Sequence, residues 1–386
     1  MQILTLVVSV LLLAGFTPAT AVAQSRPKTG SPLDDLPPHI RQATTFGERP
    51  DWSHDGKRIL FMEKTYGDVY EVELETNVIR PLTHHFFHEG FLRAFYLSNG
   101  DILLQGARHF DSRNPLVSRH QDQQELWVLK RDLSGPPTPL GRTLFEGAAV
   151  SRTRLHIAWS QDVTNADLDN EFYPHLGGDF HVGDIQYVEG IPELTNITKV
   201  DKEMPFEGEY ETQNFRPPDE KEIIFAVYHF RGEDHSAVRA LPKDRVNALG
   251  PGIETDSQGR SDERTETMGV DIATGRVTNY SKAPGQIDEP EGIFPDGRHT
   301  LVECDGHYPK GPSFHDIYKL ALDGSGRSER LTYFSDYPGY KATNPVVSDD
   351  GRYIAFQYAK YGDPGGTGRG VLIFDLVLYE KETAGH

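Results

Sequence analysis

A tight turn followed by an apolar run recurs along the chain, and this pattern limits the fold more than any other feature. The turn pair Asp55-Gly56 shows it first, because the apolar run 58–62 follows directly. Equivalent turns lie at Asn99-Gly100, Asp296-Gly297 and Asp350-Gly351, and weaker turns lead into similar runs in the segments that begin at Val150 and Phe215. Such turns join adjacent antiparallel strands, so the sequence predicts six related β-units.

Each unit continues with further alternating runs, as in residues 69–74 and 78–83 of the first unit. The last unit lacks its fourth run, but residues 39–46 have the spacing of residues 328–334, the fourth run of the fifth unit. A ring of sheets that is closed by an N-terminal strand leaves no open sheet edge. We therefore predict an all-β chain whose residues 39–386 form a single domain, a six-bladed β-propeller.

Residues 50–61 (PDWSHDGKRILF) and 67–83 (GDVYEVELETNVIRPLT) carry a family resemblance. They resemble the blades of TolB-like propellers, which are WD-repeat-like modules, and the resemblance covers residues 39–378. It implies the propeller fold. It does not imply one activity, because such blades serve in binding proteins, peptidase propellers, polysaccharide lyases and glycosidases.

The N-terminus has the pattern of a secretory signal. An apolar stretch at 3–16 precedes the small residues Ala21-Val22-Ala23, so we predict a signal peptide over 1–23, followed by a flexible leader over 24–38. An uncleaved membrane anchor is the alternative, although the stretch is short for a span and Pro18 follows it. The expected location is secreted or periplasmic, with no membrane contact after cleavage.

The charge and the cysteine content exclude some partners and bonds. The formal net charge of -19 argues against nucleic acid and against an anionic membrane surface. Cys304 is the only cysteine, so no intrachain disulfide can form, and the ring must be stabilised by packing. We expect a monomer whose partner is a carbohydrate or glycoside substrate.

Long insertions fall on one predicted face of the ring. In a propeller, the loops between second and third strands share a face with the links between blades. The long second-to-third segments are 107–124, 160–183, 228–266, 305–315 and 358–369. Most histidines lie in these loops and links, so we predict that this face is the binding side.

Positions counted back from the turns point to the mouth of the central channel. Six residues before each first turn stand Arg49, Arg93, Pro290 and Asn344, with Gln213 in about the same place of the fourth unit. Two arginines there can hold a carboxylate in a forked geometry, or they can neutralise glutamates within the ring. Both interpretations remain open at this stage.

Carboxylates are the best candidates for catalysis. The chain has no Gly-x-Ser-x-Gly elbow, no Gly-rich phosphate loop, no His-Glu-x-x-His and no Cys-x-x-Cys. Glu209 and Glu211 precede the inner strand of the fourth blade, and Glu289 and Glu291 that of the fifth. We predict that Glu209 and Glu291 form an acid/base pair, with Glu289 in substrate binding.

Histidines and a tyrosine complete the predicted site. His88 and His307 are the candidate catalytic histidines, as a base or as ligands of a divalent ion together with His315. His84, His85, His229 and Tyr173 are candidates for substrate binding. We expect no cofactor, with a divalent metal as the alternative.

Two further resemblances rank the substrates. Residues 315–334 (HDIYKLALDGSGRSERLTYF) resemble propeller oligogalacturonate lyases. Residues 336–370, with 289–305 (EPEGIFPDGRHTLVECD), are similar to secreted saponin hydrolases, which remove a glucuronosyl unit from a triterpenoid glycoside. The leading hypothesis is a secreted glycoside hydrolase that acts at a uronic-acid glycoside. A non-catalytic TolB-like propeller that binds a peptide or protein, and a metal- or His/Tyr-dependent lyase, are the alternatives.

Overall fold

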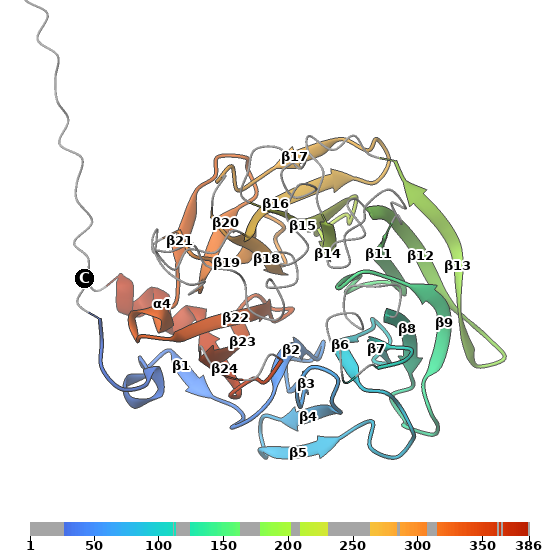
Figure 1. Cartoon of the computed structure of the whole chain (residues 1–386), viewed down its shortest axis with the longest axis horizontal. Helices are drawn as coiled ribbons and strands as arrows, with labels where there is room; N and C mark the ends of the chain where they lie inside the picture. The colour runs from blue at the N-terminus through green and yellow to red at the C-terminus, as the bar shows by residue number, and fades with distance from the viewer. Residues whose placement is uncertain are drawn as a thin grey trace, which may run out of the picture.

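Six four-stranded antiparallel sheets stand around a central axis in the computed structural model (Figure 1). The structure describes residues 27–110, 112, 124–162, 178–201, 209–230, 263–283, 286–306, 315–360, 363 and 366–384.

The strands of each sheet follow one another from the channel outward. The first three blades are β2 (Glu48–Trp52), β3 (Arg58–Met62), β4 (Val69–Glu73), β5 (Val78–Pro81); β6 (Phe91–Tyr96), β7 (Ile102–Ala107), β8 (Gln124–Leu129), β9 (Thr138–Thr143); and β10 (Ala148–Val150), β11 (His156–Asp162), β12 (Gly178–Val188), β13 (Ile191–Val200). The last three are β14 (Glu209–Phe215), β15 (Glu222–Phe230), β16 (Glu263–Asp271), β17 (Val277–Asn279); β18 (Asp288–Ile293), β19 (His299–Cys304), β20 (Asp316–Ala321), β21 (Ser328–Arg330); and β22 (Tyr340–Val347), β23 (Tyr353–Lys360), β24 (Val371–Asp375) with β1 (Ile40–Gln42).

The N-terminal strand closes the ring. β1 pairs antiparallel with β24, with Ile40 opposite Phe374 and Gln42 opposite Leu372. The sixth sheet thus gains its fourth strand from the other end of the chain, as residues 39–46 predict. The predicted six-bladed propeller is confirmed.

A hydroxyl after the outer strand fastens four of the blades. Thr83 accepts from the Val69 amide at 3.0 Å and donates to Asp68. Ser281 with Glu266, and Thr332 with Asp316, repeat the arrangement, and Thr44 accepts from the Val371 amide in the closing blade. Each bond ties an outer strand to its neighbour at one end, where the sheet is most exposed to fraying.

The innermost strands are bulged where they pass the channel. The pairing register shifts between Glu48 and Asp51, and equivalent shifts interrupt β6, β14, β18 and β22. A bulge turns the direction of the following side chains and is common beside functional sites. Arg49 and Asn344 occupy these bulges with φ of 51° and 48°.

The ends of the chain pack against the last blade. Residues 27–38, predicted as part of a flexible leader, contain the short helix η1 (Pro32–Asp35), and Leu33 and Leu36 pack against the core of that blade. The Lys28 amide also donates to Asp336, at the end of η2 (Phe334–Asp336). Apolar residues of the predicted leader therefore pack against the last blade.

A C-terminal helix, α4 (Leu376–Thr383), follows β24, and Glu382 accepts from His39 at 2.6 Å. Within the residues described, no helix is long and apolar enough to span a membrane. The predicted signal peptide, residues 1–23, lies outside the described residues.

Candidate functional site

The repeat places two sets of side chains at fixed heights along the channel. We define these heights from the amide that closes each inner hairpin, which belongs to Ser53 in the first blade. Three to five residues before it lies the glutamate level, which includes Glu48, Arg49, Arg93, Glu146, Glu211, Glu289, Glu291 and Asn344. One residue after it lies the turn level, formed by His54, Ser98, Arg152, Pro217, Pro295 and Asp349.

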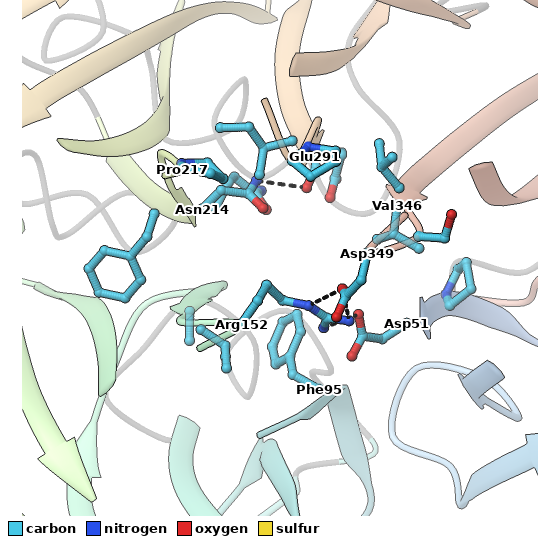
Figure 2. A pocket seen from close by; sticks show the side chains of 18 of the residues that line it. Asp51, Phe95, Arg152, Asn214, Pro217, Glu291, Val346 and Asp349 are labelled. Atoms are coloured by element: carbon cyan, nitrogen blue, oxygen red, sulfur yellow. Dashed lines mark hydrogen bonds and ion pairs between the residues drawn. The ribbon is translucent and has the colours of Figure 1, made fainter. Parts of the chain in front are cut away.

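A cavity of about 340 Å³ connects the two levels inside the channel (Figure 2). Phe95, Val150, Phe215, Ile293 and Val346 give it apolar walls. Its charged lining comprises the guanidinium groups Arg49, Arg93 and Arg152 and the carboxyl groups Asp51, Glu220, Glu291 and Asp349. A concave apolar site with a few converging charged groups is the usual form of a small-molecule site.

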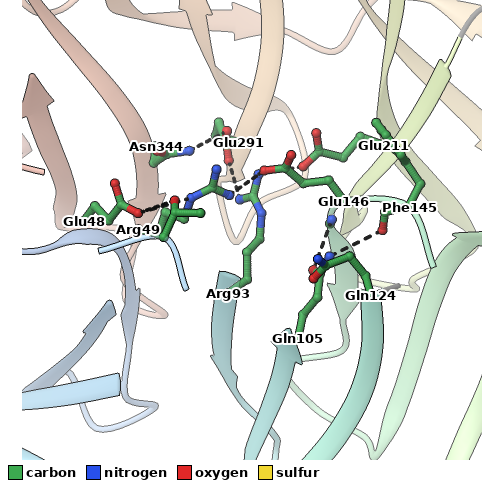
Figure 3. A network of polar contacts seen from close by, with 12 residues as sticks. Glu48, Arg49, Arg93, Gln105, Gln124, Phe145, Glu146, Glu211, Glu291 and Asn344 are labelled. Carbon is green, nitrogen blue, oxygen red and sulfur yellow. Dashed lines mark hydrogen bonds and ion pairs between the residues drawn. The ribbon is translucent and has the colours of Figure 1, made fainter. Parts of the chain in front are cut away.

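Two buried arginines bind the glutamates at one end of this cavity (Figure 3). Arg93 contacts three carboxyls: Glu211 at 2.6 Å, Glu146 at 3.4 Å and Glu291 at 3.4 Å. Arg49 contacts Glu146 at 2.6 Å. The side chains of Arg93 and Arg49 are only 6% and 10% exposed, so these ion pairs lie largely out of water.

Burial pushes the carboxyl pKa values upward in this cluster. It raises the pKa of Glu291 to about 8, with the Arg93 charge acting in the opposite direction. Burial and the charges of Glu303, Glu291 and Glu211 raise the pKa of Glu289 well above its ordinary value. A carboxyl that keeps its proton at neutral pH can act as an acid.

Tyr228 links two of these carboxyls. Its hydroxyl lies 2.6 Å from Glu211 Oε2 and within hydrogen-bond distance of Glu289. A hydroxyl has one proton to donate, so the second contact requires a protonated carboxyl as donor. The raised pKa of Glu289 assigns that proton to Glu289, and Tyr228 then donates to Glu211.

Glu211 collects donors on all sides. Besides Tyr228 and Arg93, it accepts from Gln213 Nε2 at 2.9 Å. Burial raises the pKa of Glu211, against the charge of Arg93 and the Tyr228 hydrogen bond. These three donors favour its ionised form as the charged partner of Arg93.

Asn344 holds Glu291 next to a second carboxyl. Its amide side chain donates to Glu291 Oε1 at 2.9 Å, and its backbone N–H donates to Glu303 Oε1 at 2.7 Å. Burial opposes ionisation of Glu303, but the hydrogen bond from His315 lowers its pKa below the ordinary value. Adjacent carboxyls thus have pKa values pushed in opposite directions.

Gly147 makes room for this cluster. It has φ of +86°, and a Cβ there would lie 2.5 Å from Glu211 Cγ and 2.7 Å from its Oε1. Counted from the hairpin, Gly147 occupies the position of Arg49 and Arg93 in the third blade. The third blade therefore contributes space where the first two contribute guanidinium groups.

Arg152 reaches across the other end of the channel (Figure 2). It leaves the third blade and donates to Asp349 of the sixth blade at 2.7 Å and to the Trp52 carbonyl of the first at 2.8 Å. Asp51 lies 3.5 Å from the same guanidinium, and His54 contacts Asp349 at 2.8 Å. Burial opposes ionisation of Asp349, but His54 and Arg152 together lower its pKa.

The predicted site residues divide into three groups. Arg49, Arg93, Gln213, Glu291 and Asn344 line the cavity, and Glu289 joins them through Tyr228. His84 and His85 are exposed in the link after β5, and His88 contacts Asp68 at 3.0 Å. No described contact joins these three histidines to the arginine cluster.

The remaining predicted residues lie outside what the structure describes. Tyr173 and His307 fall in segments without description, as do the side chains of Glu209 and His229, which belong to β14 and β15. The described residues contain no group of three or more His, Cys, Asp or Glu side chains that could hold a metal ion. Most residues of the long loops are also undescribed, so the binding role of that face stays a prediction.

Sequence reasoning missed Glu146, Arg152 and Asp349. The third blade has no Asn-Gly or Asp-Gly turn, so turn pairs do not align Glu146 and Arg152 with the other blades, and Asp349 stands out only through its contact with Arg152. Aligning Ser151 with Ser53 and Ser348, three serines that close inner hairpins, would have placed Glu146 beside Glu48 and Arg152 beside His54 and Asp349.

These features define a six-bladed β-propeller with a buried arginine–glutamate cluster in its channel. The sequence matches no protein-family model and no curated protein. The structure is similar to those of a putative TolB from Agrobacterium tumefaciens (14% identity, TM-score 0.44, covering 78% of this chain and 87% of that one).

Two propellers named as enzymes are also similar. One is a gluconolactonase from Xanthomonas campestris (11% identity, TM-score 0.48, 87% of this chain and 89% of that one). The other is an oligogalacturonate lyase from Vibrio parahaemolyticus (13% identity, TM-score 0.42, 82% and 73%). Similarities of this size extend no activity to this chain.

Proposed function

We propose that this propeller is a secreted hydrolase that cleaves a glycosidic bond next to a uronic acid, with the channel cavity as its active site. The observation that supports this most is Glu291, a carboxyl with a pKa of about 8 that lines a cavity together with three guanidinium groups. A protonated carboxyl beside ionised partners is the arrangement that glycoside hydrolysis requires.

In this proposal Glu291 donates its proton to the oxygen of the leaving group. Glu211, the carboxyl partner of Arg93, does not line the cavity itself, so in this proposal its ionised form accepts a proton from the attacking water through a further water. Glu211 takes the role that the sequence analysis gives to Glu209, whose side chain lies outside the described residues. Each turnover leaves Glu211 protonated and Glu291 ionised, so between turnovers Glu211 releases a proton to solvent water and Glu291 takes one up.

The cavity lining favours an acidic sugar with an apolar neighbour. If Glu291 is protonated, Glu146 and Glu211 balance the charges of Arg49 and Arg93, so the cluster carries no net negative charge that would repel an anion. A sugar carboxylate would then be held at the cavity face of these arginines, and Gln213 and Asn344 would bind hydroxyls. The walls at Phe95 and Phe215 fit the apolar face of a sugar or an aglycone.

A panel of aryl glucuronides and uronic-acid oligomers tests the proposal. Hydrolysis releases the free sugar, whereas a lyase creates an unsaturated product that absorbs in the ultraviolet. We expect hydrolysis, with kcat of Glu291→Gln lower by about 100-fold or more, the typical contribution of acid catalysis. Glu75→Gln, at an exposed turn, is the matched control and should keep full activity.

A folded protein that cleaves no member of the panel would contradict the proposal, as would a fully active Glu291→Gln variant. A non-catalytic binding propeller is the second candidate. Its supporting observation is that Arg49 and Arg93 are already paired inside the protein. Binding of a panel member to wild type and Glu291→Gln with equal affinity, without turnover, would favour it.

A further inference from the structure

A second cavity lies outside the channel, between the first and second blades. Its volume is also about 340 Å³. Ser53, Asp55, Asn99 and Gly100 line it, so it lies on the face of the short turns. Leu82, Ile102 and Leu133 give it an apolar floor. The proposed hydrolase does not use this cavity.

Three arginines from separate elements surround this second cavity. Arg58 comes from β3, Arg80 from β5, and Arg131 from the turn after β8. The acidic side chains in its lining are Asp55 and Glu71. The lining is therefore cationic by one charge, counted as three arginines against two carboxylates with His54 neutral, in a chain whose net charge is -19.

The arginine donors exceed the acceptors around them. Within the described residues, the contacts of the Arg58 and Arg131 guanidinium groups are one each: Asp55 at 3.4 Å and the Asn99 carbonyl at 3.1 Å. A guanidinium group carries five N–H donors, so most remain for a ligand or for water.

Arg80 is held in a fixed orientation. Its Nε and Nη2 contact the same oxygen of Glu71, at 2.9 Å and 2.7 Å. Glu71 is 5% exposed, and its other oxygen accepts from the Tyr96 hydroxyl. One edge of the Arg80 guanidinium is thus bound to the protein, and its remaining Nη1 donors are not used by Glu71.

We propose that this second cavity binds an oxyanion: a carboxylate, sulfate or phosphate group on a small molecule. Planar guanidinium forks match the oxygen geometry of all three groups, and converging forks bind them more tightly than single cations do. The net charge of the chain is strongly negative, so an anion needs local positive charge of the kind that these three arginines supply.

Calorimetric titration of the full chain with inorganic sulfate, inorganic phosphate and glucuronate tests the proposal. Ionic strength is kept constant with sodium chloride, because a general salt effect would mimic binding. We expect saturable binding of at least one probe, and the probe that binds identifies the oxyanion class. Arg131→Ala and Arg80→Ala should each weaken it by about tenfold, the typical effect of losing a charge-assisted hydrogen bond.

Arg298→Ala is the matched control, because Arg298 is exposed in the turn between β18 and β19 and lines neither cavity. Arg131 is exposed, so its variant should remain folded, which circular dichroism checks. Wild-type affinity in both Arg80→Ala and Arg131→Ala would overturn the proposal, as would the absence of saturable binding. Glu291→Gln should bind sulfate and phosphate normally, which separates this result from the fate of the proposed hydrolase, whose cavity would take glucuronate.

Discussion

The two levels of the channel both pair arginines with carboxyl groups, but the carboxyl pKa values shift in opposite directions. At the glutamate level, Arg93 is buried among Glu146, Glu211 and Glu291, and burial raises the pKa of the Glu211 and Glu291 carboxyls. At the turn level, Arg152 and His54 are partly exposed, and the pKa of Asp349 is lowered.

The difference shows how one repeat supplies two kinds of electrostatic environment. Positions four to six residues apart along the same inner hairpin give a buried cluster rich in carboxyls at one level and a partly exposed chain of ion pairs at the other. Carboxyl groups are expected to keep a proton more readily at the first level, where burial disfavours ionisation, and to stay ionised at the second. Three predictions test this contrast.

The largest effect is expected from removing the cation of the glutamate level. Arg93→Ala leaves three carboxyls without their shared partner, and an uncompensated buried charge costs about 3–5 kcal/mol. The free energy of unfolding, from urea denaturation, measures the loss. Arg298→Ala, an exposed arginine, should change it by less than about 0.5 kcal/mol.

If Arg93→Ala and Arg298→Ala were equally stable, the cluster would not be the tightly coupled unit described here. Adding Glu211→Gln to Arg93→Ala should recover part of the loss, because it removes one of the unpaired charges.

An intermediate effect is expected from pH, with opposite signs at the two levels. The folded pKa of Glu291, about 8, exceeds its ordinary value of 4.5. Its stabilising contribution is therefore complete below about pH 4.5 and is lost as pH rises through about 8. Asp349, whose pKa is lowered from 3.8, stabilises above that value and loses its contribution as pH falls through the folded pKa.

The free energy of unfolding as a function of pH measures both slopes. Glu291→Gln should flatten the alkaline side by on the order of 2 kcal/mol, since neighbouring carboxyls titrate together with it. Asp349→Asn should flatten the acid side only. Identical pH profiles for the two variants would refute the proposed contrast.

The smallest effect is expected at Arg152. Its side chain is 29% exposed and Asp349 is 30% exposed, so water replaces much of the lost pairing. Arg152→Ala should cost about 1 kcal/mol, near the upper range for solvent-accessible pairs. Ser98→Ala changes the same repeat position in the second blade without removing a charge, and should lie within about 0.5 kcal/mol of wild type. If Arg152→Ala lowered the free energy of unfolding as much as Arg93→Ala does, the proposed difference between the two levels would be wrong.

The architecture and half of the cluster could be predicted from local patterns. Turn pairs such as Asp55-Gly56 fixed the strand register, and counting from them brought Arg49, Arg93 and Asn344 to the channel. The repeat itself therefore carried this information, because equivalent positions of a propeller blade face the same axis.

The remaining contacts depend on ring geometry that no single blade reveals. Arg152 meets Asp349, which is 197 residues away, only because the third and sixth blades face each other across the channel. Glu146 precedes a weak turn, and its partner Arg93 belongs to another blade. Of the two interpretations offered for the arginines, the ion pairs show that they neutralise glutamates; because they also line the cavity, binding of a ligand carboxylate stays a proposal.

The pairing of β1 with β24 has a consequence for how the molecule is made. β1 is synthesised early but can pair only late, because its partner β24 is synthesised more than 300 residues later. Contacts this distant in sequence form slowly, since the intervening chain must first be ordered. Until β24 has been synthesised, β1 has no partner strand, so the ring of a nascent chain stays open.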